Sequence, residues 1–148
     1  MLTYSQARES CHNKFGKLFE PQSVASNQAV YNLYQRDFRM SGKRWIGINS
    51  LKGNGYRFDS NGQIPPFDID NMWHSGNSEY SHEMCVAQSE DDELWWDRDC
   101  SSISYQSICE LSQESQPSSL FNQINMLNDS IAKGSQLKEG KKKIIFYI

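Results

Sequence analysis

The sequence predicts an α+β domain in which two helices precede an antiparallel sheet that one long loop interrupts. Apolar residues follow helical spacing within about the first 40 residues. Short apolar runs of the strand type then recur as far as Cys109. Between residues 61 and 81 the chain is rich in Gly, Pro, Asn and Ser and has no periodicity, which is typical of a functional loop. Together these patterns indicate helices and strands in separate parts of one domain.

The first helix is expected to begin after Thr3. Thr3 and Gln6 have the spacing of a capping box, in which side chains satisfy the free amides at a helix start. Ala7 and Cys11 then lie on one helical face, and Gly16 is expected to end the helix. A second helix is expected after the polar segment 23–27, with Val30, Leu33 and Tyr34 facing the core and an end before Ser41.

Five short strands are expected after the helices. They are Trp45–Ile48, Tyr56–Phe58, Cys85–Ala87, Leu94–Trp96 and Ser107–Cys109. Gly47 in the first of them permits a close approach of another backbone segment. Three of the four tryptophans, Trp45, Trp73 and Trp95, are expected in the core because they are large and apolar.

The composition changes after Glu110. We expect a domain over residues 1–110, a Ser/Gln/Pro linker over 111–119 and a tail over 120–148. Leu120, Ile124, Leu127 and Ile131 have the spacing of a short amphipathic helix within this tail. The apolar stretch at 144–148 is too short to span a membrane, and its abrupt end suggests a fragment.

Charge and composition favour a binding module. The formal net charge is −3 with both signs interspersed, so neither nucleic acid nor an anionic membrane is expected as a partner. No run approaches the ~20 apolar residues of a membrane span. Because no catalytic triad or phosphate-binding loop can be identified from spacing, we expect no enzyme.

Four cysteines, Cys11, Cys85, Cys100 and Cys109, indicate an oxidising compartment. None has the Cys-x-x-Cys spacing of a zinc or redox site, and an even number at wide spacing favours two disulfides. Spacing alone leaves three pairings open. The N-terminus has neither the basic segment nor the apolar run of a signal peptide, so we expect an extracellular protein whose leader is missing from this chain.

In order and spacing, six pieces of the chain together resemble the C-type lectin-like domain over about residues 1–110. They are Ala7 to Cys11 with Gly16-Lys17-Leu18, Trp45-Ile46-Gly47-Ile48, Trp73 with Gly76, Glu83-Met84-Cys85-Val86, Trp95-x-Asp97-x-x-Cys100 and Ile108-Cys109-Glu110. The resemblance implies the C-type lectin-like fold with the pairings Cys11–Cys109 and Cys85–Cys100. It also implies a first strand upstream of Thr3, which this chain lacks.

Sugar-binding members of that family hold a calcium ion at the long loop, and the sugar's hydroxyl groups coordinate it. By resemblance, Glu83 and Asp97 match two of the calcium ligands, and Asn77 and Glu79 lie in the motif that supplies others. The motif's cis proline is absent, with Ser78 in its place in the ungapped alignment. Trp96 replaces a ligand asparagine, and an indole offers only an N–H donor.

Two interpretations of these residues stay open. Asn77, Glu79, Glu83 and Asp97 either form a modified calcium site or are solvated loop residues of a domain in which Ca²⁺ binding is weak or lost. Trp96 either contacts a ligand or packs beside Trp95. We therefore expect a secreted lectin-type module that binds a glycan or glycoprotein at Asn77, Glu79, Glu83, Trp96 and Asp97. The alternative is a calcium-independent module that binds a protein ligand with Trp96 as its anchor.

Overall fold

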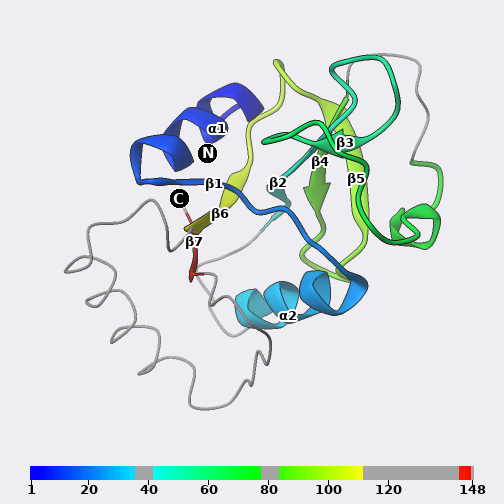
Figure 1. The fold of residues 1–148 in the computed structure, drawn as a ribbon. Coiled ribbons are helices and arrows are strands. Elements are labelled where there is room, and N and C mark those ends of the chain that lie inside the picture. The colour runs from blue at the N-terminus through cyan, green and yellow to red at the C-terminus, as the bar shows by residue number, and fades with distance from the viewer. Residues whose placement is uncertain (36–41, 78–83, 112–143, 148) are drawn as a thin grey trace.

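The computed structural model describes residues 1–35, 42–77, 84–111 and 144–147. Two helices, α1 (Tyr4–Asn13) and α2 (Val24–Gln35), flank a single sheet (Figure 1). The strands are β1 (Gly16–Leu18), β2 (Arg44–Asn49), β3 (Arg57–Phe58), β4 (Met84–Gln88), β5 (Trp95–Asp99), β6 (Gln106–Leu111) and β7 (Ile144–Tyr147). A short 3-10 helix, η1 (Asp70–Met72), lies in the long loop. The predicted α+β class and all five predicted strand positions are confirmed.

The sheet has the order β1-β6-β2-β4-β5, with β3 paired to β2 and β7 paired to β6. All pairs are antiparallel except β2 with β6, where Arg44 lies opposite Gln106. This order places β2 at the centre with both of its edges paired, and a buried cluster packs on each of its faces. All six residues of β2 are consequently buried.

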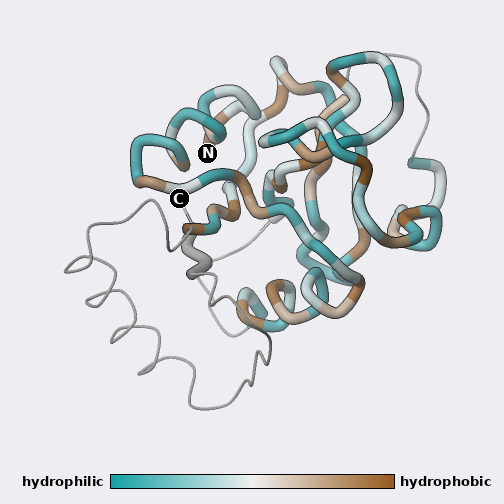
Figure 2. Tube along the Cα trace, in the orientation of Figure 1, coloured by the Kyte–Doolittle hydropathy of each residue, from teal (hydrophilic) through white to brown (hydrophobic). Residues whose placement is uncertain are grey.

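Two buried clusters lie on opposite faces of the sheet because side chains alternate along each strand. Trp45 packs with Tyr4, Ala7 and Cys11 of α1 on one face. Ile46 and its neighbours pack on the other face with residues of α2, of the long loop and of β5. Figure 2 shows that the outer side of α1 is mostly hydrophilic, which fits a helix that buries only one narrow face.

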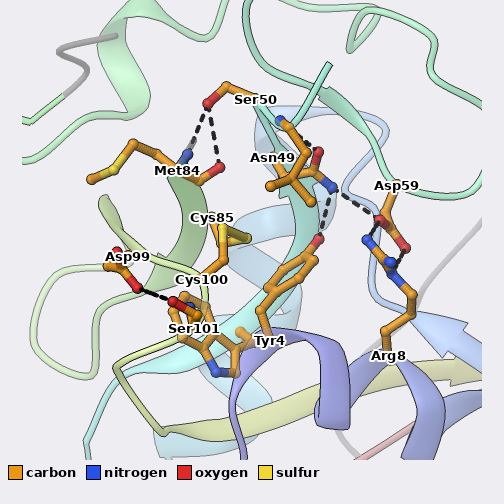
Figure 3. The surroundings of a disulfide bond; sticks show 12 residues. Tyr4, Arg8, Asn49, Ser50, Asp59, Met84, Cys85, Asp99, Cys100 and Ser101 are labelled. Carbon is orange, nitrogen blue, oxygen red and sulfur yellow. Dashed lines mark hydrogen bonds and ion pairs between the residues drawn. A yellow bond between two sulfur atoms is a disulfide. The ribbon is translucent and has the colours of Figure 1, made fainter. Parts of the chain in front are cut away.

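Both predicted disulfides are present. Cys11 of α1 is joined to Cys109 of β6, and Cys85 of β4 is joined to Cys100, which follows β5. Their Cα–Cα separations of 5.5 and 5.1 Å lie within the usual range for a disulfide. The first bridge therefore fastens the N-terminal helix to the sheet, and the second joins two neighbouring strands (Figure 3).

The helix start agrees with its prediction, and the helix end does not. The Thr3 amide donates to Gln6 Oε1 at 3.0 Å, as a capping box requires. The helix ends at Asn13 and not at Gly16, because Phe15 adopts a positive φ of 62° and turns the chain. Gly16 instead opens β1, where an added Cβ would lie 2.5 Å from the Glu110 carbonyl oxygen.

Gly47 has the role that the sequence predicts. A Cβ at this position would lie 2.7 Å from Glu20 Cγ and 2.9 Å from the Leu18 carbonyl oxygen. The Gly47 amide donates to the Phe19 carbonyl oxygen at 2.7 Å. The segment after β1 therefore crosses β2 at a distance that only glycine allows.

The final residues carry a strand that the sequence does not predict. β7 pairs antiparallel with β6, with Ile144 opposite Leu111 and Tyr147 opposite Ile108. The expected helix over Leu120–Ile131 lies outside the described residues. Within the residues that are described, no helix has the length and apolar character needed to cross a membrane.

Candidate functional site

Strand β5 divides the predicted site residues between two faces of the sheet. Trp95 and Asp97 point inward and are buried, whereas Trp96 and Arg98 point outward and are partly exposed. Trp95 is fixed by Asn27 of α2, whose Oδ1 accepts from Trp95 Nε1 at 3.0 Å. Consequently Trp96 and Asp97, although adjacent in sequence, do not share one surface.

Asp97 takes part in the core. Its carboxylate is only 6% exposed and accepts a hydrogen bond from the Tyr56 hydroxyl at 3.2 Å. The Tyr56 ring packs against Trp73 with centroids 4.5 Å apart. Trp73 in turn meets Trp95 edge to face at 5.7 Å. Asp97 therefore ties the long loop to the sheet through an aromatic stack.

Asn77 contacts a guanidinium group. Arg98 Nη1 donates to Asn77 Oδ1 at 3.0 Å and also to the Asp97 carbonyl oxygen at 2.6 Å. Asn77 Nδ2 donates to the His74 carbonyl oxygen at 3.2 Å, so both ends of the carboxamide are bonded. A positive side chain thus lies on the carboxamide oxygen that a calcium ion would need.

Trp96 is surrounded by three nitrogen-bearing side chains. The His74 ring stacks on it with centroids 4.1 Å apart and an interplanar angle of 26°. Lys43 Nζ lies 4.3 Å and Arg98 Cζ 4.4 Å from the ring centroid. The stacked His74 ring covers one face of Trp96, and Lys43 and Arg98 lie at distances typical of cation–π contacts. We call Lys43, His74, Trp96 and Arg98 the Trp96 surface.

Acidic residues partly balance the Trp96 surface. Glu90 Oε2 lies 3.9 Å from Lys43 Nζ, and Asp92 Oδ2 lies 3.9 Å from His74 Nε2. Both belong to the turn that joins β4 to β5, where Asp92 Oδ1 also accepts from the Leu94 amide at 3.2 Å. The acidic run 90–93 therefore belongs to a turn, and two of its carboxylates face Lys43 and His74 beside Trp96.

The described residues do not fit a calcium ion. Calcium requires six to eight oxygen ligands. Of the predicted ligands, Asn77 accepts from Arg98 and Asp97 accepts from Tyr56, and the nearby guanidinium would repel a cation. In the described part of the chain, no group of three His, Cys, Asp or Glu residues could hold a metal ion. The other two predicted ligands, Glu79 and Glu83, lie outside it.

Sequence reasoning identified Trp96 but missed the cations around it. Arg98 could have been found, because residues two apart on a strand share a face. Lys43 could not, because it approaches Trp96 only through the pairing of β2, β4 and β5. His74 also depends on tertiary structure, since its amide donates to the Trp95 carbonyl oxygen at 2.9 Å.

A sequence-family comparison matches residues 1–111 of the chain to the Lectin C-type domain. That match covers the two helices, both disulfides and strands β1 to β6. Among curated proteins, none matches the chain in sequence.

Solved structures with a similar fold have diverse described properties. A calcium-independent type II antifreeze protein is 22% identical, with a TM-score of 0.58 over 73% of this chain and 77% of that one. The carbohydrate-recognition domain of the human scavenger receptor C-type lectin is 20% identical, with a TM-score of 0.57 over 73% and 81%. Human lithostathine is 22% identical, with a TM-score of 0.56 over 66% and 69%. At these identities the likeness extends to the fold alone.

Proposed function

The chain belongs to the C-type lectin domain family, and from this premise we propose that it is an extracellular recognition module that binds its ligand without calcium. The ligand class we propose first is a glycan, carried free or on a glycoprotein. Binding takes place at the long-loop end of the sheet, and the Trp96 surface supplies the main contacts. The module binds and does not catalyse, in keeping with the general role of these domains.

The contact between Arg98 and Asn77 supports this proposal most directly. A guanidinium carries a permanent positive charge and donates up to five hydrogen bonds. By holding Asn77 Oδ1 at 3.0 Å, Arg98 orders the loop end at 77 against β5. In this proposal Arg98 holds Asn77 in place, and that contact needs no calcium ion.

The Trp96 surface offers suitable chemistry for polar ligands. Arginine and lysine donate to sugar hydroxyls and to carboxylates, and the edge of an indole supplies apolar contact. His74, Lys43 and Arg98 surround the Trp96 ring, so a sugar would meet the ring together with these donors. The site residues in this proposal are Asn77, Trp96 and Arg98, with Lys43 and His74 at the rim.

The two disulfides support the extracellular placement. Disulfides such as Cys11–Cys109 and Cys85–Cys100 form and persist in oxidising compartments. Asn77 and Asp97, two of the four predicted calcium ligands, already accept hydrogen bonds from Arg98 and Tyr56. This is the reason for placing calcium outside the recognition mechanism.

The test of calcium independence is thermal unfolding of the oxidised protein in millimolar calcium and in chelator. Calcium binding at 100 times its dissociation constant would add about 2.7 kcal/mol of stability. We expect the same midpoint in both conditions. A rise in the midpoint with calcium would contradict the proposal.

The test of ligand class is a glycan panel probed in chelator with the wild type, Trp96→Ala and Val24→Ala. Val24 is an exposed apolar residue in the first turn of α2 and serves as the control. We expect glycan binding by the wild type and Val24→Ala and its loss in Trp96→Ala. Glycan binding that occurs only with calcium, or that ignores Trp96, would contradict the proposal.

A second candidate is recognition of a protein ligand through the same surface. Tryptophan and arginine are enriched among the residues that dominate protein interfaces, and here they lie 4.4 Å apart. Absence of binding to every glycan on the panel would favour this second candidate. The deciding observation would then be a deglycosylated protein ligand that binds the wild type and Val24→Ala but not Trp96→Ala.

A further inference from the structure

A cavity of about 360 Å³ lies at the C-terminal end of β2, next to Asn49. Arg8 of α1, the segment that follows β2 and the turn that follows β3 line it. Its volume falls in the range of small-molecule sites, which begins near 300 Å³. The Trp96 surface contributes none of its lining residues, so the cavity is a separate feature of the molecule.

The cavity is positively charged on a negatively charged protein. Its lining contains three cations, Arg8, Lys52 and Arg57, and one carboxylate, Asp59. Three positive charges minus one give +2, whereas the whole chain carries −3. Positive charge is therefore concentrated at the cavity although the protein as a whole is negative, and this favours the binding of an anion there.

The carboxylate in the cavity is already neutralised. Arg8 Nε donates to Asp59 Oδ2 at 2.9 Å, and Arg8 Nη2 donates to Asp59 Oδ1, which forms a bidentate pair. Asn49 Nδ2 donates to the same Oδ1 at 2.9 Å (Figure 3). Asp59 therefore acts as a fixed part of the wall and leaves the other two cations to determine the charge that a ligand meets.

Hydrogen bonds of Asn49 fix the wall of the cavity on its buried side. Asn49 Oδ1 accepts from the Leu51 amide at 3.1 Å, and Asn49 Nδ2 also donates to the Tyr4 hydroxyl at 3.3 Å (Figure 3). Burial, reinforced by the charge of Asp59, raises the pKa of Tyr4 well above its usual value. The phenol therefore stays protonated, and Asn49 and Asp59 keep their positions without a ligand.

Lys52 and Arg57 keep hydrogen-bond donors that a ligand could use. Within the described part of the chain, neither residue takes part in an ion pair. Arg57 Nε donates to the Asn54 carbonyl oxygen at 3.2 Å, which fixes the guanidinium and leaves its two terminal nitrogens. Lys52 Nζ lies 3.4 Å from the point where a Cβ on Gly62 would stand, so its ammonium reaches across to the turn after β3.

We propose that this cavity binds an oxyanion, a sulfate or phosphate group, with Lys52 and Arg57 as its principal ligands and Arg8 as a third, already positioned donor. Guanidinium and ammonium groups are the side chains that bind such groups most strongly. The group can arrive as a free anion or as an ester on a saccharide. The proposal is independent of the function assigned to the Trp96 surface.

The test is a titration of the full oxidised chain in chelator, followed by two-dimensional NMR of the backbone amides. The probes are inorganic sulfate, inorganic phosphate, galactose 6-sulfate and unsulfated galactose. We expect saturable shifts at residues 52–62 with the three anions and none there with galactose. Tighter binding of galactose 6-sulfate than of sulfate would identify a saccharide ester as the source, and equal binding would identify the free anion.

Single substitutions locate the site. Hydrogen bonds to charged groups contribute about 1.5–3 kcal/mol, so Lys52→Ala and Arg57→Ala should each raise the dissociation constant about tenfold or more. Lys14→Ala removes one exposed cation beyond the end of α1, and we expect it to change the constant less than twofold. The proposal is overturned if no anion shifts residues 52–62, if both cavity variants bind like the wild type, or if Lys14→Ala loses as much affinity as they do.

Discussion

The region around α1 and the Trp96 surface lie on the same sheet but differ in how their side chains are held. Around α1, buried groups are held by specific partners: Cys11 is bonded to Cys109, and Glu20 accepts from Ser60 and pairs with Lys17. At the Trp96 surface, partly exposed side chains surround one ring, and its cations keep donors that solvent can reach. The first region therefore determines stability, and the second can change its chemistry without loss of the fold.

Alternate residues of β5 lie in different environments. Trp95 and Asp97 on the inner face of β5 bond to Asn27 and Tyr56, so their identity is constrained by packing. Trp96 and Arg98 on the outer face contact the loop residues His74 and Asn77 and lie outside the buried core. A family's fold and its binding chemistry are thus encoded by alternate residues of a single strand.

The disulfide of the α1 region should have the largest effect. Replacing both Cys11 and Cys109 with Ser opens a loop of 98 residues. In the chain-entropy model such a loop stabilises a protein by about 4.7 kcal/mol. We expect a loss of this order in the free energy of unfolding, measured by urea denaturation.

The second disulfide provides the control. Replacing Cys85 and Cys100 with Ser opens a loop of only 15 residues, for which the same model gives about 3 kcal/mol. A larger loss from this pair than from Cys11 and Cys109 would mean that the α1 region is not the more important anchor.

Removal of a buried carboxylate should have an intermediate effect. Glu20 is 1% exposed, and its oxygens accept from the Ser60 amide at 2.7 Å and the Ser60 hydroxyl at 2.8 Å. Breaking a fully buried ion pair costs 3–5 kcal/mol, but the Lys17 side chain is 39% exposed, so we expect about 2 kcal/mol for Glu20→Ala. Glu20→Gln, which keeps an acceptor for Ser60, should lose less in the same urea measurement.

Glu20→Ala should also change how the free energy of unfolding depends on pH in the alkaline range. Burial lowers the pKa of Lys17, but Glu20 and Glu110 outweigh it and raise that pKa above its ordinary value of 10.5. A raised pKa in the folded state stabilises the protein below pH 10.5, and this contribution is lost as pH rises further. We expect a shallower alkaline loss in Glu20→Ala, and an unchanged slope would show that Glu20 does not hold the Lys17 proton.

The α1 region was predicted well because the residues that determine it are close in sequence or, like cysteine, have a characteristic structural role. A capping box, a helical Ala7–Cys11 face and cysteines within an ordered family pattern specify helix, packing and pairing together. The end of α1 was wrong because Phe15 adopts the positive φ that the sequence assigns to Gly16. β7 was missed because its partner, β6, is more than thirty residues away in sequence.

The candidate site was predicted less well because it depends on tertiary contacts. Sequence alone identified Trp96 as the residue that breaks the calcium motif. It did not place Asp97 in the core. The acidic residue matched a calcium ligand in sequence, and its hydrogen bond with Tyr56 depends on the tertiary structure. The contact of Lys43 with Trp96 likewise exists only once the strands have paired.

The smallest effect on stability is expected from Trp96→Ala. The corresponding variant in the α1 region is Trp45→Ala, so the same substitution can be compared between the two regions. Each cation over an exposed aromatic ring contributes about 0.5–1 kcal/mol, and Arg98 would keep its bonds to Asn77 and to the Asp97 carbonyl. We therefore expect a loss of about 1 kcal/mol in urea denaturation.

Trp45→Ala removes a ring that is fully buried and whose Nε1 donates to the Leu2 carbonyl oxygen at 2.9 Å. Its loss should be about 3–5 kcal/mol, as for other tryptophans truncated in a core. If the two variants lost equal stability, Trp96 would be a structural residue. If Trp96→Ala keeps its fold and loses its ligand, then the outer face of β5 is dispensable for folding, and selection is free to change what the domain binds there.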